Sequence, residues 1–409
     1  MTVIRRLQWS LALVIALAVL WYGFKAYRQY ASGVRLGFHR IAEGPSEEVL
    51  LDFRSQAPPE RLVQGFPPEA RPRNVILILG DGLGFHQISA ARMALKGVNG
   101  RLFMERFPVT GWMWTHSLNQ LYTDSAAGAS ALATGFKTEP LMLSQTPEGQ
   151  PQKTFLEAAM ERGMRGAMIT TSTIFDATPA AFVVHHDYRR DYPEVTSQMA
   201  ASGVELLLGE ALLRDDDEWS DLWATILMNY RSQGYQIAKT WTQLKELEAS
   251  SAEKVVGFLP PDSLTKERNT TPVLADLSAL ALERLGDAEE GFFLLVEDED
   301  TDTHSHRGNM DRVIDAVAAL DAVAQQAVEF ADANGETLVL ITADHETGAL
   351  ALLDGDDGAH LGYRWLSGDH SASPVPLLAY GPGAERFSGV FDNTEIPRIL
   401  DELLDLGLF

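Results

Sequence analysis

The chain has 409 residues, 45% of them hydrophobic, which is enough to bury a large core in one domain with insertions or in two domains. Its formal net charge of -24 argues against nucleic acid and anionic membrane surfaces as partners. If the chain binds anions such as phosphate, the site must concentrate positive charge locally, and bound metal ions are the obvious source. The chain has no cysteine, which excludes disulfides, thiolate zinc sites and cysteine nucleophiles.

The first predicted element is an apolar segment at the N-terminus. Residues 7–24 carry no charge, and a run of this length just suffices to span a bilayer, with Trp21 and Tyr22 suited to the interface. A cleaved signal peptide is the alternative, but the run is long for one and no convincing small-x-small cleavage site follows it. We therefore expect residues 1–24 to form an uncleaved signal-anchor that crosses the membrane as a helix.

Residues 25–72 are predicted to be a tether, because charged and polar stretches alternate there with two Pro-Pro pairs. The globular domain is expected over residues 73–409. It begins with an apolar run at residues 74–79, followed by Gly-Asp-Gly. The length and β-branched content of this run predict a buried parallel strand with a loop at its carboxyl end. A helix-like segment follows from about residue 87 to residue 95.

A polar Thr-Asp-Ser turn at residues 123–125 leads directly into a run of very small residues that ends at Thr134. Such a turn is a good helix N-cap, and it would leave the Ser125 hydroxyl at the positive end of a helix, where an anion is favoured. A serine in that place can carry a negative charge or a phosphoryl group. Considered alone, the motif is better explained by a plain helix cap followed by a close helix contact, and the rest of the chain has to decide between the two interpretations.

The rest of the chain alternates helical patterns with short apolar runs. Helices are predicted at residues 154–162, 276–285, 311–334 and 396–406, and strands at residues 166–171, 292–296, 337–341 and 376–380. This alternation predicts an α/β fold with a largely parallel central sheet that helices cover on both faces. The segment from about residue 192 to residue 271 is helical in pattern and partly acidic, and we expect it to form a helical cap inserted into the main domain.

Polar residues gather at the predicted carboxyl ends of the strands, where ligands bind in open α/β sheets. They are Asp81, Thr178, Glu297, Asp302, His306, Asp344 and His345, with His370 in the loop before the last strand. Singly, each has a simpler explanation: a Gly-Asp-Gly turn, a solvated or calcium-binding acidic loop, or a surface histidine. Together, the histidines and carboxylates match the ligands of zinc, and Asp81, Glu297 and the Thr178 hydroxyl make an all-oxygen set suited to magnesium.

The chain resembles the alkaline phosphatase family in six blocks that keep the family's order and internal spacings. The blocks are residues 74–84 (Asn-Val-Ile-Leu-Ile-Leu-Gly-Asp-Gly-Leu-Gly), 123–127 (Thr-Asp-Ser-Ala-Ala) with 134–138 (Thr-Gly-Phe-Lys-Thr), 176–181 (Asp-Ala-Thr-Pro-Ala-Ala), 296–306 (Val-Glu-x4-Asp-x3-His), 342–345 (Thr-Ala-Asp-His) and 370–382 (His-x9-Tyr-Gly-Pro). The resemblance implies an alkaline-phosphatase-like fold and the hydrolysis of small phosphate monoesters to an alcohol and inorganic phosphate. It also implies a catalytic domain outside the cytoplasm, on the periplasmic side, or a secreted one if residues 1–24 are removed.

The resemblance further implies two Zn²⁺ and one Mg²⁺ per subunit, with a role for each matched residue. Ser125 would be the zinc-coordinated nucleophile that becomes phosphorylated, and Arg189 would clamp the phosphate. One zinc would be held by Asp302, His306 and His370, the other by Asp81, Asp344 and His345, and the magnesium by Asp81, Thr178 and Glu297, with Asp176 and Thr303 behind these ligands. A homodimer is expected from the family, although no motif in this chain encodes it.

Two features depart from the family pattern. At Thr303, directly after the first zinc aspartate, the family often has Lys, His or Trp, and the partnering position here is Asp176. This difference leaves phosphate affinity and product release open, although it does not change the reaction class. The insertion between Arg189 and Glu297 is also short, so the family's cap and dimer contacts transfer poorly.

Three other functions fit parts of the same pattern. A sulfatase needs a modifiable Cys or Ser followed at fixed spacing by Pro and Arg, but Ala-Ala-Gly-Ala follows Ser125, so this function is rejected. A phosphodiesterase of the same superfamily shares nearly all of the metal ligands, although the Thr-Asp-Ser-Ala-Ala block and Arg189 favour monoesters. A membrane-tethered metal- or phosphate-binding protein without catalysis is disfavoured by the intact nucleophile and the full ligand set.

Overall fold

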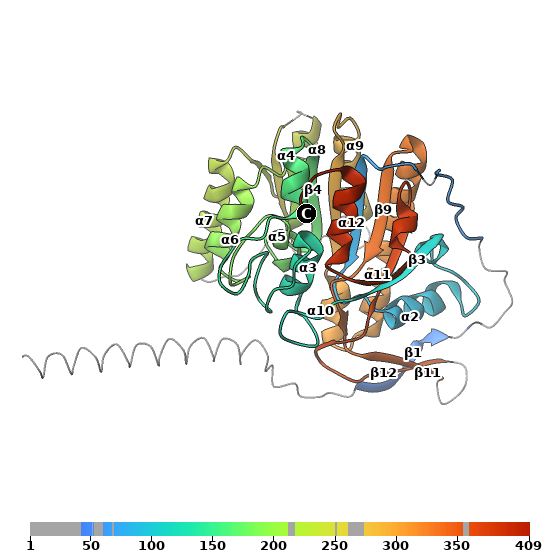
Figure 1. The fold of residues 1–409 in the computed structure, drawn as a ribbon. Helices are drawn as coiled ribbons and strands as arrows, with labels where there is room; N and C mark the ends of the chain where they lie inside the picture. The colour runs from blue at the N-terminus through green and yellow to red at the C-terminus, as the bar shows by residue number, and fades with distance from the viewer. Residues whose placement is uncertain are drawn as a thin grey trace, which may run out of the picture. The chain divides into compact units, whose positions relative to one another are not determined.

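Short apolar strands line up in one long sheet at the centre of the computed structural model (Figure 1). The strand order is β15-β3-β14-β9-β2-β8-β4-β5-β7-β6. These strands are β2 (Asn74–Gly80), β3 (Val109–Trp114), β4 (Arg165–Thr173), β5 (Leu206–Glu210), β6 (Gln236–Ala238), β7 (Val255–Leu259), β8 (Phe292–Asp298), β9 (Thr337–Thr342), β14 (Val375–Tyr380) and β15 (Gly389–Asp392). Neighbouring strands are parallel except at β14, which is antiparallel to β3 and β9. The prediction of an α/β fold with a largely parallel sheet is confirmed.

The structure describes residues 42–50, 52, 60–67, 69–211, 217–249, 252–260, 274–354 and 360–409. Within these ranges, no helix has both the length and the apolar character needed to cross a membrane. The signal-anchor predicted for residues 1–24 lies outside the described residues, so the anchor and the location that depends on it stay predictions.

Helices flank the sheet and bury apolar side chains against it. Those discussed below are α2 (Phe85–Lys96), α3 (Ser125–Thr134), α4 (Phe155–Glu161), α9 (Leu274–Leu285), α11 (Met310–Asn334) and α12 (Glu395–Leu404). In α11 the buried residues Val313, Val317, Leu320 and Ala324 recur every three or four positions, and this stripe faces β2, β8 and β9. Helices α9 and α11 contact each other on one face of the sheet, and α3, α4 and α12 contact one another on the other (Figure 1).

The segment at residues 192–271 corrects one expectation, because it is not a purely helical cap. It holds α6 (Tyr192–Ala201), α7 (Asp217–Ser232) and α8 (Trp241–Ala249), but also strands β5, β6 and β7, which extend the central sheet beyond β4. The apolar runs of β5 and β7 are only five residues long, so their strand signal was hidden among helical patterns. They form strands because the edge of β4 offers hydrogen-bonding partners and a buried surface.

The described part of residues 25–72 also differs from a free tether. Strand β1 (Ala42–Leu50) pairs antiparallel with β12 (His360–Trp365) in a three-stranded sheet with β11 (Leu350–Asp354). Further along, the Leu62 N–H donates to the Arg106 carbonyl at 2.8 Å, and the Phe66 ring meets Tyr380 edge to face at 5.7 Å. Apolar side chains in this polar stretch bind residues 60–67 to the domain surface. Charge and proline content alone therefore do not show that this part of the predicted tether is attached to the domain.

Candidate active site and metal centre

The candidate site lies at the carboxyl ends of β2, β8 and β9. Strand β2 lies between the other two and runs parallel to both, with Leu79 opposite Glu297 on β8 and Thr342 on β9. Because all three strands end at the same edge, Asp81 after β2 and Asp344 after β9 emerge next to the last residues of β8. The sheet topology therefore brings together residues that are more than two hundred positions apart in the sequence.

The first group of ligand-type side chains is Asp302, His306 and His370. Their donor atoms all lie within 4.8 Å of one another. Asp302 and His306 lie one turn apart on α10 (Asp300–His306), with Oδ2 and Nε2 3.2 Å apart, and the Nε2 atoms of His306 and His370 are 3.1 Å apart. Each Nδ1 faces a backbone carbonyl, that of Gly368 for His306 (2.8 Å) and that of Thr123 for His370 (2.6 Å).

This geometry fits a bound cation. A histidine that donates Nδ1–H to a carbonyl directs a lone pair from Nε2, and two such lone pairs at 3.1 Å repel unless a proton or cation lies between them. Burial opposes the ionisation of Asp302, but hydrogen bonds with His306 and His370 outweigh it and hold the pKa of this carboxyl well below its usual value. One carboxylate and two imidazoles are donors that zinc prefers.

The second group consists of Asp81, Asp344 and His345, all of which are buried. Nε2 of His345 lies 3.4 Å from Asp81 Oδ1, 3.3 Å from Asp344 Oδ2 and 3.4 Å from Ser125 Oγ. These two carboxylate oxygens, Asp81 Oδ1 and Asp344 Oδ2, receive no hydrogen bond from the described residues. Burial and the neighbouring carboxylates raise the pKa of Asp81 well above its usual value and that of Asp344 to about 7. Buried, unpaired carboxylates of this kind are costly unless a cation compensates them.

A set of oxygen ligands lies beside the second group. Glu297, the sixth residue of β8, and Thr178, in the short helix α5 (Ala177–Ala181), are both buried. Within the described part of the chain, Glu297 Oε2 and Thr178 Oγ1 have no hydrogen-bond partner. Burial raises the pKa of Glu297 to about 8, and the charge of Glu297 in turn contributes to the raised pKa of Asp81. Two carboxylates and a hydroxyl form the hard, all-oxygen environment that magnesium takes.

Ser125 is the first residue of α3. The Thr-Asp-Ser motif can therefore both cap this helix and present a candidate nucleophile. Asp124 is the N-cap, and its Oδ1 accepts from the Ala127 N–H at 3.0 Å. Every residue of α3 is buried, and a Cβ added to Gly128 would lie 2.9 Å from the Asp344 carbonyl oxygen. The small residues thus let the helix pack directly on the loop after β9, which presents Ser125 to His345.

Arg189 is fixed between the N-caps of two helices. Its guanidinium binds Asp176, the N-cap of α5, at 2.9 Å and Asp124 at 3.4 Å. Burial opposes the charged form of Arg189, but the two carboxylates outweigh it and raise the pKa of Arg189 further above its usual value. Burial also opposes the charged form of Asp176, but the charge and hydrogen bond of Arg189 outweigh it and lower the pKa of Asp176. The arginine is therefore charged and preorganised close to Ser125, through contacts with the residue that precedes it.

Thr303 does not contact Asp176 through any hydrogen bond in the described residues. Its hydroxyl donates to Glu299 Oε1 at 2.6 Å, while Asp176 is occupied by Arg189. The sequence analysis did not identify Glu299 or the role of Asp124 in binding Arg189. Asp124 could have been identified from the sequence, because it is a predicted N-cap next to the candidate nucleophile. Glu299 could not, because the sequence pattern does not distinguish one carboxylate in an acidic run from its neighbours.

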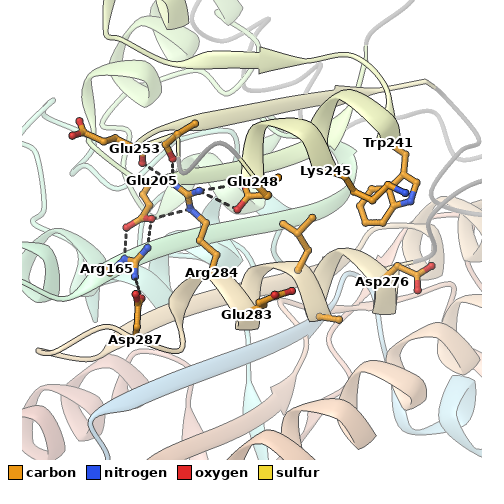
Figure 2. A pocket seen from close by; sticks show the side chains of 14 residues that line it. Arg165, Glu205, Trp241, Lys245, Glu248, Glu253, Asp276, Glu283, Arg284 and Asp287 are labelled. Carbon is orange, nitrogen blue, oxygen red and sulfur yellow. Dashed lines mark hydrogen bonds and ion pairs between the residues drawn. The ribbon is translucent and has the colours of Figure 1, made fainter.

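The amino ends of β4 and β5 carry a second charged cluster, shown in Figure 2. Arg165 binds Glu205 and Asp287, and Arg284 binds Glu205 at 2.8 Å and Glu248 at 3.0 Å. They line a groove of about 880 Å³. In contrast to the carboxyl ends, no buried side-chain oxygen or nitrogen among these five residues lacks a partner. We therefore interpret this cluster as an ion-pair network that supports the fold.

Comparison with known proteins identifies the family of the chain. The family model for alkaline phosphatase matches residues 72–360. The chain belongs to the alkaline phosphatase family. Streptomycin-6-phosphate phosphatase of Streptomyces griseus is 31% identical over 79% of this chain and 88% of that protein, and alkaline phosphatase H of Pseudomonas aeruginosa (strain UCBPP-PA14) is 28% identical over 97% and 98%. The chain is accordingly a phosphatase, an enzyme of the hydrolase class.

Solved structures of the family share the fold. The alkaline phosphatase from the Antarctic bacterium TAB5 superposes with a TM-score of 0.74 at 27% identity, over 82% of this chain and 98% of that chain. A variant of that enzyme, with a TM-score of 0.72, was solved with Mg bound in its M3 site. His370 lies beyond the region that the family model matches, so its place in the site rests on the geometry described above.

Proposed function

We propose that the protein hydrolyses phosphate monoesters through a phosphoserine on Ser125, with metal ions held by the neighbouring ligand groups. The observation that carries this proposal is the position of Ser125. Its hydroxyl lies at the N-terminus of α3 and 3.4 Å from Nε2 of His345, and it faces the group that contains the unpartnered oxygens of Asp81 and Asp344. A nucleophile, a ligand group and a helix terminus thus converge at one point.

Three metal ions fit the side chains. One zinc would be held by Asp302, His306 and His370, a second by Asp81, Asp344, His345 and Ser125, and one magnesium by Asp81, Thr178 and Glu297. When bound, the metals supply Lewis acidity, which favours the deprotonated form of an adjacent hydroxyl and offsets charge on phosphoryl oxygens. The buried oxygens without partners, and the histidine nitrogens that face one another, support this assignment.

The protein's own groups then account for the two halves of the reaction. Ser125 Oγ attacks phosphorus as the ester P–O bond breaks, so the alcohol leaves and a phosphoserine remains; water then breaks the Oγ–P bond and releases inorganic phosphate. Backbone N–H groups in the first turn of α3 bind the phosphoryl oxygens together with Arg189. Asp124 and Asp176 hold that guanidinium in place from two sides before substrate arrives.

The proposal is tested with the full chain and p-nitrophenyl phosphate, assayed with and without a chelator, alongside bis-p-nitrophenyl phosphate as a diester. We expect chelator-sensitive hydrolysis that favours the monoester, and an acid-stable phosphoenzyme that Ser125→Ala abolishes. The control is Ser197→Ala, because Ser197 is an exposed serine on α6, and this variant should keep both the hydrolysis and the phosphoenzyme. A phosphoenzyme that persists in Ser125→Ala would overturn the assignment of the nucleophile, and a preference for the diester would favour a phosphodiesterase.

A further inference from the structure

The histidines of the two ligand groups are oriented by different kinds of partner. His306 and His370 direct Nδ1 at backbone carbonyls, at 2.8 Å and 2.6 Å. His345 directs Nδ1 at the side-chain hydroxyl of Thr347, at 3.2 Å. A backbone carbonyl is present whatever the residue, whereas a hydroxyl depends on one side chain. The orientation of His345 therefore depends on Thr347 in a way that the other two histidines do not share.

The same hydroxyl also contacts the other ligand group. Thr347 Oγ1 donates to Asp302 Oδ1, and Thr347 is fully buried. A hydroxyl has one proton and two lone pairs, so it can donate to a carboxylate and accept from the Nδ1–H of His345 at once. With Nδ1 protonated, the Nε2 lone pair of His345 faces Ser125, and Asp302 keeps Oδ2 toward His306 at 3.2 Å.

Thr347 is held in place by backbone contacts on three sides. It lies in β10 (Glu346–Thr347), which pairs with β13 (His370–Ser371) so that Thr347 stands opposite His370. Its carbonyl accepts from the Gln87 side chain at 2.8 Å, and its N–H donates to the Gly82 carbonyl at 3.2 Å. Gly82 has φ 69°, and a Cβ there would lie 2.7 Å from the Thr347 hydroxyl, so this glycine leaves room for the hydroxyl beside Asp302.

We infer that Thr347 is a positioning residue that couples the two zinc sites through one shared hydroxyl. It fixes the His345 tautomer that presents Nε2 to the second group, and it orients Asp302 in the first group. This inference rests on the proposed metal binding. Removing the hydroxyl leaves a buried N–H and a buried carboxylate oxygen without this partner, and outer hydrogen bonds of this kind change metal affinity by about 10–100-fold.

The test compares Thr347→Val, which keeps the shape and removes the hydroxyl, with Thr347→Ser, which keeps the hydroxyl. Thr196→Val is the matched control, because Thr196 is also fully buried and its hydroxyl has one donated and one accepted bond outside the ligand groups. It donates to the Tyr192 carbonyl at 2.7 Å and accepts from the Asn229 side chain at 3.1 Å. Zinc affinity of the full chain is measured at each step by competition with a chromogenic chelator. The ring tautomers are read from ¹⁵N-histidine spectra of the zinc-loaded protein.

We expect Thr347→Val to weaken zinc binding at both sites by about 10–100-fold and to remove the hydrogen-bonded Nδ1–H signal of His345. Thr347→Ser should restore both, and Thr196→Val should change neither. Unchanged zinc affinity at either site in Thr347→Val, or an equal loss in Thr347→Ser, overturns the coupling alone. If Thr347→Val does not fold, the serine variant decides, since loss of zinc or of the Nδ1–H signal there contradicts the inference. A wild-type chain that binds no zinc overturns the proposed function, and the inference with it.

Discussion

The two ends of the parallel sheet both gather charged side chains, yet they do so in opposite ways. At the amino ends, Arg165 and Arg284 are each bound by two carboxylates, and Glu205 joins the two arginines (Figure 2). At the carboxyl ends, Asp81 and Asp344 are buried, and each has one oxygen that receives no hydrogen bond from the described residues. The density of charge is therefore alike at the two ends, and what distinguishes them is the hydrogen bonding of the buried oxygens.

The physical reason is the cost of taking charge out of water. A buried carboxylate oxygen without a hydrogen-bond donor loses its hydration and is not compensated within the protein, so a cation or substrate that binds it supplies the missing interaction. A carboxylate bound by arginine already has that interaction. The charges at the amino ends are therefore paired within the protein, whereas at the carboxyl ends the proposed metal ions would supply the missing interaction.

The largest effect is expected from a substitution at the carboxyl ends. Asp344→Asn removes one metal ligand, and because a metal supplies several kcal/mol of transition-state stabilisation, kcat/KM should fall about a thousandfold or more. The same variant should be more stable than the wild type when both are chelated, because it removes a buried carboxyl group whose charged form is opposed by burial and by the neighbouring carboxylate of Asp302. Activity, zinc content and urea unfolding check this, and a chelated variant that is less stable would contradict the comparison.

Metal removal should affect the wild-type chain nearly as strongly, and with a definite pH dependence. Binding at a thousand times Kd stabilises the folded state by about 4 kcal/mol, which a chelator removes. In the folded chain burial raises the pKa of Glu297 to about 8 and that of Asp344 to about 7. The unfolded chain thus releases these protons at lower pH, so the stability of the chelated protein should fall as pH rises from about 5 to about 8.

Urea unfolding across this pH range, with chelator and with zinc, checks the prediction. The zinc-loaded protein should show a flatter profile, because the carboxylates stay ionised in the folded state. A chelated protein whose stability rises over the same range would show that these carboxyls are not the groups that titrate.

A smaller effect is expected at the amino ends. Arg284 is nearly buried and binds Glu205, Glu248 and two backbone carbonyls, so Arg284→Met should cost about 2–4 kcal/mol of stability. Zinc content and kcat/KM of the folded fraction should not change, in contrast to Asp344→Asn. Thermal unfolding with an activity assay checks this, and a loss of zinc in this variant would remove the distinction between the two ends.

The smallest effect is expected for an ion pair on the surface. Lys153 and Glu161 form a pair in which both side chains are largely exposed, so Lys153→Ala should change stability by less than about 0.5 kcal/mol. This variant sets the baseline for Arg284→Met in the same unfolding assay. An equal loss of stability in Lys153→Ala and Arg284→Met would mean that burial of an ion pair does not determine how much it contributes to stability.

The sequence anticipated a large part of the fold and much of the candidate site. Continuous apolar runs such as residues 74–79 and 337–341 predicted the central strands, because a parallel strand buried on both faces has no polar positions to confuse the pattern. The ligand-type residues after these strands were also identified, since their chemistry is legible by residue type. The short strands β5 and β7 were missed because each has only five residues, which is too few to stand out among helical patterns. The docked segment at residues 60–67 was missed because the stretch around it is polar and rich in proline.

What the sequence determined by itself is therefore local: which runs are buried, where each strand ends, and which polar side chains follow it. Only the tertiary structure decided which of those side chains are left without partners. Arg189 binds Asp124, which lies 65 positions away, and the Thr347 hydroxyl binds Asp302, which lies 45 positions away. Pairing depends on distances of about 3 Å that the fold sets, and no spacing along the sequence encodes them.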